Sequence, residues 1–205
     1  MSETVIQVTS LGKRIKGKTI LEDISFEINK GDCVALIGPN GAGKTVLMSC
    51  ILGDKKPSSG QVLIDGKAGK AKNKIAVLLQ ENTIPNSLKV EELIAFFQSI
   101  SDNPLTNQEV QDLLQFKEDQ YQQFADKLSG GQRRLLAFVL CLIDKPKILF
   151  LDEPTAGMDT STRQRFWEIV NDLKKAGTTI LYSSHYIEEV EHTADRILVL
   201  HQGKL

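Results

Sequence analysis

The amino-acid sequence predicts an α/β fold with a mostly parallel central sheet. Short apolar β-type runs alternate with segments of helical spacing, the pattern expected for parallel strands joined by crossover helices. Gly38–Thr45 (GPNGAGKT) connects one apolar run to a helix and fits the phosphate-binding pattern GxxxxGK[ST]. Polar residues directly follow other apolar runs, at the position where open α/β sheets bind ligands. An N-terminal antiparallel β-subdomain and an inserted α-helical subdomain complete the expected fold.

The composition is that of an ordinary globular chain, with 205 residues, 41% of them hydrophobic and 25% charged. This length suits one domain, 1–205, or one domain with an inserted subdomain. A net charge of -1 provides no electrostatic argument for nucleic acid or for an anionic membrane, and we expect no nucleic-acid partner. The longest apolar run, Leu135–Ile143, has nine residues, against about 20 for a membrane-spanning helix.

The three cysteines are odd in number, widely spaced and surrounded by apolar residues. Cys33, Cys50 and Cys141 are therefore expected to be buried, reduced thiols of a cytosolic protein. The spacing is not typical of a metal site or a disulfide framework.

The first third of the chain is rich in β-type runs. The second of these alternates apolar and polar residues, which predicts an antiparallel sheet with one face buried. The strands expected here are Val5–Val8, Ile20–Ile28, Cys33–Ile37 and Gln61–Ile64, and the helix that follows the phosphate-binding loop is Val46–Leu52, ending at Gly53.

The middle of the chain begins with Ile75–Leu79, an apolar run expected to be a buried parallel strand with Gln80 at its tip. Beyond it the character changes, because prolines punctuate the chain and the apolar spacing becomes helical. We expect a helical subdomain over 82–143, with 1–81 and 144–205 as the core. Its first helix presents Leu93, Phe96, Phe97 and Ile100 on one face, and its second carries Val110, Leu113 and Leu114 behind a capping box at Thr106 and Glu109.

The last third returns to alternating strands and helices. Leu128–Gln132 opens a helix that runs to Ile143, and Ile148–Leu151 is expected to be a central parallel strand. Ser161 and Gln164 are interpreted as a capping box for the next helix. The remaining elements are expected at Phe166–Leu173 (helix), Thr178–Ser184 (strand), Ile187–His192 (acidic helix) and Ile197–Leu200 (strand).

The phosphate-binding loop predicts a polyphosphate site. Amides of the loop and of the following helix carry partial positive charge and point at one spot. Lys44 would reach the β- and γ-phosphates, and the Thr45 hydroxyl would bind Mg²⁺. A chance match is the alternative, and the flanking strand and helix argue against it. The residues expected to bind are Gly38, Pro39, Asn40, Gly41, Ala42, Gly43, Lys44 and Thr45.

Polar residues at three other strand ends predict hydrolysis of the bound phosphate. Asp152 would bind Mg²⁺ or its water, and Glu153 would act as general base on the attacking water. Gln80 would contact both Mg²⁺ and that water, and His185 would donate a hydrogen bond to the γ-phosphate. The structural alternatives are a solvated turn for the two carboxylates and the glutamine, and a purely structural role for the histidine.

Ser129-Gly130-Gly131 places bare backbone amides at a helix N-terminus, which predicts a second anion site. Two anion sites separated by an inserted helical region need not face the same phosphate within one molecule.

These motifs together resemble those of an ABC-transporter ATPase cassette, a P-loop NTPase of the ABC ATPase type. GPNGAGKT, the glutamine of VLLQE, LSGGQ, ILFLDEP, AGMD and SSH occur in the family's order and approximate spacing over nearly the entire chain. The segments AGMDTSTRQRFW and SSHYIEEVEHTADRILVL look most like cassettes of bacterial multidrug, antibiotic or ion exporters.

The resemblance implies a Mg²⁺-dependent ATPase that works as a head-to-tail dimer with C2 symmetry, either of two copies or of two related subunits. ATP would lie between the phosphate-binding loop of one subunit and Ser129, Gly130, Gly131 and Gln132 of the other. Asp159 would carry contacts across this interface, and the region just after Gln80 would receive a transmembrane permease encoded on another chain. The implied location is cytoplasmic, peripheral on the inner face of the cell membrane through that permease.

Three features depart from the family's pattern. Ile15 stands where an aromatic side chain usually stacks on adenine, which predicts a weaker base contact and reduced selectivity between ATP and GTP. Val46 replaces a common second hydroxyl residue, but its amide remains available to the α-phosphate. The last strand is followed by few residues, as expected of a minimal or a shortened cassette.

Two other functions compete with a transporter ATPase. A soluble ABC-type ATPase in DNA repair or translation would usually carry two cassettes, a long coiled coil or a basic arm, and the sequence has none of these. A nucleotide-binding module without turnover is disfavoured by Glu153.

Overall fold

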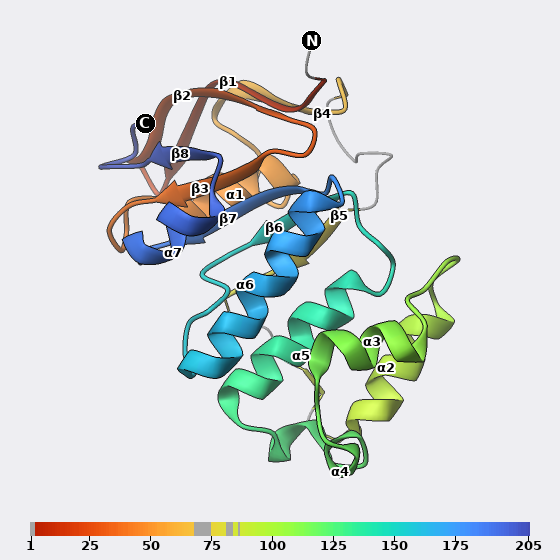
Figure 1. The fold of residues 1–205 in the computed structure, drawn as a ribbon. Coiled ribbons are helices and arrows are strands. Elements are labelled where there is room, and N and C mark those ends of the chain that lie inside the picture. Colours follow the sequence, from red (N-terminus) through yellow and green to blue (C-terminus); the bar gives the residue numbers. More distant parts are fainter. Residues whose placement is uncertain (1–2, 68–74, 81–83, 86) are drawn as a thin grey trace.

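The computed structural model describes residues 3–67, 75–80, 84–85 and 87–205, apart from the side chain of His192. Two sheets dominate the described part of the chain (Figure 1). A three-stranded sheet has the order β2-β1-β4, and a five-stranded sheet has the order β5-β6-β7-β3-β8. The expected α/β class, with an N-terminal antiparallel part and a parallel central sheet, is confirmed.

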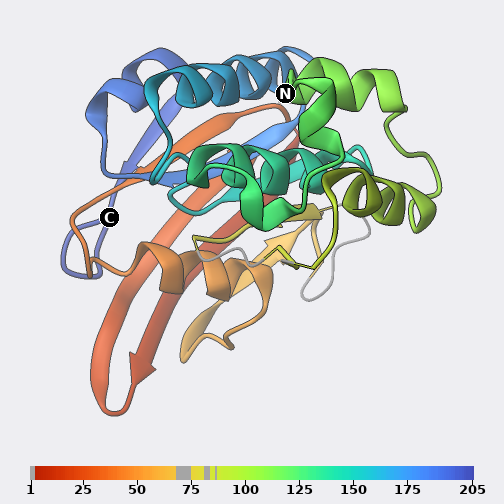
Figure 2. The ribbon, with the colours of Figure 1, turned by 90° about the horizontal axis from the view of Figure 1, so that it is seen from below.

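The antiparallel sheet is formed by β1 (Thr4–Ile15), β2 (Lys18–Asn29) and β4 (Ser59–Ile64). Lys16 and Gly17, with φ of 49° and 79°, turn the chain between β1 and β2. Both strands are longer than their apolar runs, because their exposed polar ends continue the pairing as far as Ile15 and Lys18. The hairpin therefore projects beyond the rest of the sheet (Figure 2).

The central sheet pairs its strands in parallel throughout. Leu78 lies opposite Leu151, Leu151 opposite Tyr182, and Ile37 opposite Ser184. The polar residues that follow these strands therefore gather at one edge. The strands are β3 (Cys33–Ile37), β5 (Ile75–Leu78), β6 (Ile148–Leu151), β7 (Thr179–Ser184) and β8 (Arg196–Val199).

Two hydrophobic cores cover the two faces of the central sheet. Along β6, Ile148 and Phe150 point into the core shared with the antiparallel sheet and α1 (Lys44–Leu52). Leu149 and Leu151 point into the core shared with the remaining helices. Because both faces are buried, the strand reads as an unbroken apolar run rather than an alternating one.

The helices on the second face form two layers in Figure 1. The helices α5 (Gly130–Leu142) and α6 (Thr160–Lys175) lie nearer the sheet, and α2 (Val90–Ser99), α3 (Asn107–Leu114), α4 (Glu118–Tyr121) and the 3₁₀ turn Ala125–Lys127 lie beyond α5. The short α7 (Ile187–Thr193) follows β7. The described helices are all too short or too polar to cross a membrane.

The capping box at α3 is confirmed, since Thr106 Oγ1 accepts from Glu109 N at 3.2 Å and Glu109 Oε2 accepts from Thr106 N at 2.7 Å. The cysteines are free thiols. Burial raises the pKa of Cys33 to about 12 and that of Cys141 to about 11, so both stay protonated and unreactive at neutral pH.

Four details of the sequence interpretation are wrong. Cys141 is only half-buried, whereas Cys33 and Cys50 are buried as expected. The strand β5 is not fully buried, because it lies at the edge of the sheet and three of its four residues are only half-buried. Phe96 and Ile100 are 55% and 65% exposed, so only part of the expected apolar face of α2 is covered. Asp159, and not Ser161, caps α6, because its Oδ1 accepts from Thr162 N at 3.0 Å.

Candidate active site

The phosphate-binding loop runs between β3 and α1, as expected. A Cβ atom at Gly38 would lie 2.1 Å from the carbonyl oxygen of Leu200, so no larger residue fits there. Gly43, at φ 108°, is the N-cap of α1 and adopts a left-handed conformation that a side chain disfavours. The first turn of α1 contains no acidic residue. The free amides at this helix start are therefore available to an anion, without an acidic side chain in the same turn to repel it.

Lys44 is almost fully buried beneath this loop, with its side chain 6% exposed. Its Nζ donates to the carbonyl oxygens of Gly38 at 2.7 Å and Pro39 at 3.4 Å. The same ammonium lies 3.6 Å from Glu153 Oε1, and Glu153 Oε2 lies 3.5 Å from His185 Nδ1. The structure thus brings together three of the residues singled out from the sequence, from α1 and from the ends of β6 and β7.

The position of Glu153 depends on its backbone. Its φ of 44° is unusual for a residue with a side chain, and its N–H donates to Ser183 Oγ at 2.8 Å. The Ser183 hydroxyl in turn donates to Asp152 Oδ1. This buried serine, on β7, therefore fixes both carboxylate-bearing residues from the neighbouring strand. From the sequence, Ser183 was known only as a member of the SSH motif.

The residues expected to bind Mg²⁺ offer a consistent set of oxygen ligands. The exposed Thr45 and the buried Asp152 line one small cavity of about 10 Å³, together with Leu79 at the end of β5. Hydroxyl and carboxylate oxygens are ligands that Mg²⁺ prefers, and phosphate oxygens and water usually complete its shell. Within the described residues, no cluster of three His, Cys, Asp or Glu side chains is placed to hold a metal ion. Thr45 and Asp152 thus fit an ion whose other ligands are phosphate oxygens and water.

Gln80 lies exposed after β5, on the edge strand of the sheet. Its backbone carbonyl accepts from Arg134 Nη1 at 3.0 Å. Arg134, on α5, also donates to carbonyls after β6, and burial lowers the pKa of its guanidinium from the usual range. This arginine was not among the residues singled out from the sequence, where its only signal is its place two residues after LSGGQ.

Ser129, Gly130, Gly131 and Gln132 form the start of α5, away from the phosphate-binding loop (Figure 1). Ser129 Oγ accepts from Gln132 N at 3.2 Å, and Gln132 Oε1 accepts from Ser129 N at 3.1 Å. Ser129 and Gly130 are exposed, and a Cβ atom at Gly130 would meet nothing within 4 Å. In the described part of the chain, no hydrogen bond or ion pair links these residues to Gly38–Val46. They form an open, separate half-site.

Asp159 lies beside that half-site. A Cβ atom added to Gly131 would be 3.1 Å from Asp159 Oδ2, and this carboxylate also accepts from Thr162 and Ser161. Hydrogen bonds from Thr162 and Ser161 lower the pKa of Asp159 well below its usual range.

Ile15 ends β1 and is half-buried beside the hairpin turn, while Leu21, on β2, packs nearest to Gly43. The base-contacting role of Ile15 stays a prediction.

A buried carboxylate supports the segment around His185. Glu189, 8% exposed on α7, accepts from Thr155 Oγ1 at 2.7 Å and from Ser184 Oγ at 3.0 Å. Arg163 Nε lies 3.7 Å away without forming a hydrogen bond. The loop after β6 and the end of β7 are thereby joined behind the site.

Comparison with known proteins agrees with this arrangement. The family profile described as ABC transporter matches residues 21–156. The linearmycin resistance ATP-binding protein LnrL of Bacillus subtilis is 34% identical over 212 residues, covering 98% of this chain and 68% of that protein. Nod factor export ATP-binding protein I of Ralstonia nicotianae is 33% identical over 214 residues, covering 99% of this chain and 66% of that protein.

The chain thus spans about two thirds of the length of these relatives. A solved ATP-binding subunit of an ABC transporter superposes with a TM-score of 0.85 at 26% identity, covering 98% of this chain and 88% of that one. The two chains therefore share the fold over nearly all of this chain. Profile, relatives and fold all lead to one assignment: this chain belongs to the ABC transporter family, as one of its ATP-binding members.

Proposed function

We propose that this chain is the Mg²⁺-dependent ATP-hydrolysing subunit of a membrane exporter, and that ATP closes two such subunits head to tail. The observation that carries the proposal is the separation of two anion sites. Lys44, Glu153 and His185 converge on one side of the molecule. Within the described residues, no hydrogen bond or ion pair joins them to Ser129–Gln132, where Ser129 and Gly130 are exposed. A second subunit in C2 symmetry would complete each site with the other's half.

In that site the loop amides, including that of Val46, and the Lys44 ammonium would bind the phosphates. Phosphate oxygens would replace the carbonyls of Gly38 and Pro39 and the carboxylate of Glu153 as partners of Lys44. Mg²⁺, held by Thr45, Asp152 and Gln80, would supply charge neutralisation at the β- and γ-phosphates.

Hydrolysis would proceed by attack of water on the γ-phosphorus. Glu153, released from Lys44, would accept the proton of that water as the new P–O bond forms and the bond to ADP breaks. His185, now 3.5 Å from Glu153, would donate a hydrogen bond to the γ-phosphate. Loss of that phosphate would remove a charge that both subunits bind. The dimer would then open.

The export role rests on the relatives, which are named for linearmycin resistance and Nod factor export. We propose that a permease on a separate chain carries the subunit to the cytoplasmic face of the membrane. Its docking region would include the residues just after Gln80, which lie outside the described residues, together with the exposed Phe96 of α2 and Ile100 directly after it. On this proposal 82–143 forms the helical subdomain, and 1–81 with 144–205 forms the core.

The decisive experiment uses Glu153→Gln, with the exposed Glu118→Gln as a matched control. We expect Glu153→Gln to lose hydrolysis by about 100-fold or more, because the general base is gone while the phosphate contacts remain. It should also elute as a dimer on gel filtration when MgATP is present, and as a monomer without it. Retained hydrolysis in Glu153→Gln would contradict the catalytic assignment. Failure of a multi-spanning membrane protein to co-purify with the chain from its own cells would contradict the transport role.

A further inference from the structure

Arg134 makes an unusual set of contacts from the first turns of α5. Its guanidinium donates to the carbonyl oxygens of Leu79 and of Gln80, the latter at 3.0 Å, after the end of β5. It also donates to those of Asp152, Glu153 and Pro154, at 3.1, 3.4 and 3.0 Å, after the end of β6. These partners are all backbone carbonyls, so Arg134 holds the backbone conformation of the two segments rather than the position of a side chain.

The three carbonyls after β6 are consecutive along the chain. For them to converge on one planar group, the backbone must turn sharply between them, and Glu153 does so at φ 44°. That conformation is sterically disfavoured for a residue with a Cβ atom and persists only where its surroundings hold it. Ser183 holds the Glu153 N–H from the β7 side, and Arg134 holds the carbonyls from the α5 side.

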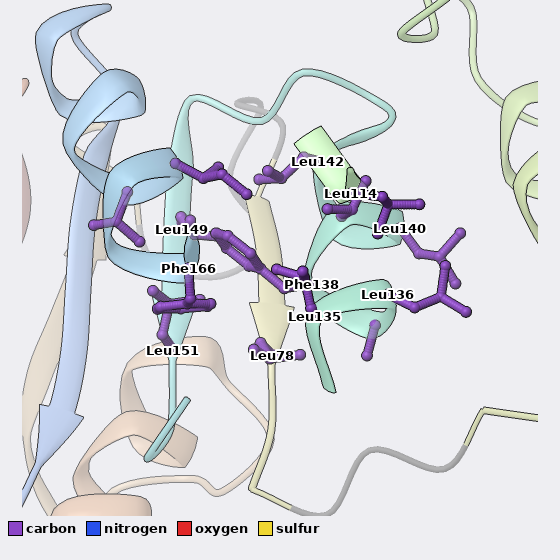
Figure 3. Packing of buried hydrophobic residues seen from close by; sticks show 14 of the residues in the cluster. Leu78, Leu114, Leu135, Leu136, Phe138, Leu140, Leu142, Leu149, Leu151 and Phe166 are labelled. Carbon is purple, nitrogen blue, oxygen red and sulfur yellow. The ribbon is translucent and has the colours of Figure 1, made fainter. Parts of the chain in front are cut away.

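The helix that carries Arg134 is itself firmly placed. Leu135, Phe138 and Leu142 are buried in the core that includes Leu78 and Leu151 at the ends of β5 and β6 (Figure 3). The same helix begins at the exposed half-site, only one turn before Arg134. A displacement of that first turn would therefore be transmitted through the guanidinium to the loops that carry Gln80 and Glu153.

We propose that Arg134 is a positioning residue that sets the orientation of Glu153 and Gln80 together with that of the half-site offered to the second subunit. This inference rests on the proposed function of the same site. Arg134 touches no reacting atom, and it acts through the backbone of residues that do. A lysine cannot replace it, because a single ammonium has no planar fork of donors to hold five carbonyls.

The chain offers a matched control in the adjacent residue. Arg133 is half-buried like Arg134, but it donates to the carbonyls of Ala125, at 3.2 Å, and Asp126, at 2.8 Å, within the helical region. Arg133→Lys therefore changes the same chemical group one position away without touching the strand ends.

The first measurement is steady-state hydrolysis of MgATP by the full chain. We expect Arg134→Lys to lower kcat by about 10- to 100-fold with KM within about threefold, because the phosphate contacts remain while the base is misplaced. Arg133→Lys should keep most of its kcat. Adding Arg134→Lys to Glu153→Gln should cause little further loss, because the arginine acts through the glutamate. Equal kcat in the two lysine variants, or fully additive losses with Glu153→Gln, would overturn the proposal.

The second measurement needs neither nucleotide nor hydrolysis. Amide hydrogen exchange should speed up at 75–80 and 148–156 in Arg134→Lys, and at 123–128 in Arg133→Lys, with the midpoint of thermal unfolding little changed. Unchanged exchange at both strand ends in Arg134→Lys would refute the proposal by itself. If the unaltered chain hydrolysed no ATP, the proposed function would fail, and the exchange pattern would still decide whether Arg134 holds these loops.

Discussion

Three oxygen atoms, two of backbone carbonyls and one of a carboxylate, surround the positive charge of Lys44. In the structure its ammonium is shared among two carbonyls of its own loop and the carboxylate of Glu153. A bound polyphosphate would provide stronger, charge-assisted partners. Lys44 is therefore held beneath the loop, and its removal also takes a cation away from the half-buried Glu153.

We predict that Lys44→Ala raises the dissociation constant for ATP by about 100-fold or more, because two charge-assisted hydrogen bonds are lost. Titration with a fluorescent ATP analogue measures this directly. Lys55→Ala, an exposed lysine just beyond α1, serves as the control and should bind normally. Unchanged affinity in Lys44→Ala would show that the phosphates do not bind at this loop.

Ile15 presents an aliphatic side chain at the end of β1. We predict that ATP and GTP are hydrolysed at similar rates, because a branched aliphatic side chain does not distinguish the two purine faces. Ile15→Tyr should lower KM for ATP about fivefold or more, since stacking of a base on an aromatic ring contributes roughly 1–3 kcal/mol. Competition between ATP and an adenine-modified analogue gives the same comparison. Strong discrimination against GTP by the unaltered chain would contradict this prediction.

At the scale of the elements, α6 shows which of two nearby N-cap candidates, Asp159 and Ser161, caps the helix. Asp159 accepts from Thr162 N, and Ser161, already inside the helix, donates its hydroxyl to Asp159 at 2.7 Å. Asp159 is the N-cap because its carboxylate accepts several hydrogen bonds and its negative charge is favourable at a helix N-terminus. A Ser161 cap would leave those donors without this partner.

This cap predicts an acid-dependent component of stability. The pKa of Asp159 is lowered in the folded chain by bonds from Thr162 and Ser161. Its stabilisation is therefore complete above the unfolded pKa, near 4, and is lost as the pH falls toward the folded value. In Asp159→Asn the neutral cap has no such dependence. The difference between the urea unfolding midpoints of the two chains should be constant above about pH 5 and should shrink progressively as the pH falls below about 4. Asp172→Asn, exposed in the same helix, is the control. A difference independent of pH would contradict this account.

At the scale of the whole molecule, the chain contains two groups of residues that are each proposed to form half of an ATP site. Lys44 is buried beneath an exposed loop, and the start of α5 is open at Ser129 and Gly130. On the proposed function, the two halves meet only when two subunits assemble.

We predict that two inactive variants restore activity when mixed. Lys44→Ala lacks a working loop and Ser129→Arg lacks a working half-site, so each is inactive alone. In the mixed dimer the loop of one and the half-site of the other form one intact site. Random mixing should then restore about a quarter of the normal activity, because half of the dimers are mixed and each has one of two sites. Mixing Lys44→Ala with Lys44→Ala is the negative control, and no recovery in the mixed sample would contradict head-to-tail assembly.

Local patterns in the sequence determined much of this protein. The apolar runs of β3, β6 and β7, the loop glycines and the capping box of α3 depend on neighbouring residues, so spacing alone predicts them. The parallel arrangement followed from the alternation of strands and helices. The parallel arrangement in turn predicted that the polar residues after each strand lie at the same edge of the central sheet.

Only the tertiary structure decided which of those residues meet. The strand order places β5 at the edge, so Glu153 and His185 approach Lys44 while Gln80 stays exposed. Ser183 and Arg134 acquire their roles from partners 30 and 55 residues away in sequence. Such contacts depend on how elements pack and not on their own composition. The sequence by itself therefore determined the parts of the site, and three-dimensional packing decided which parts one subunit assembles and which it leaves open.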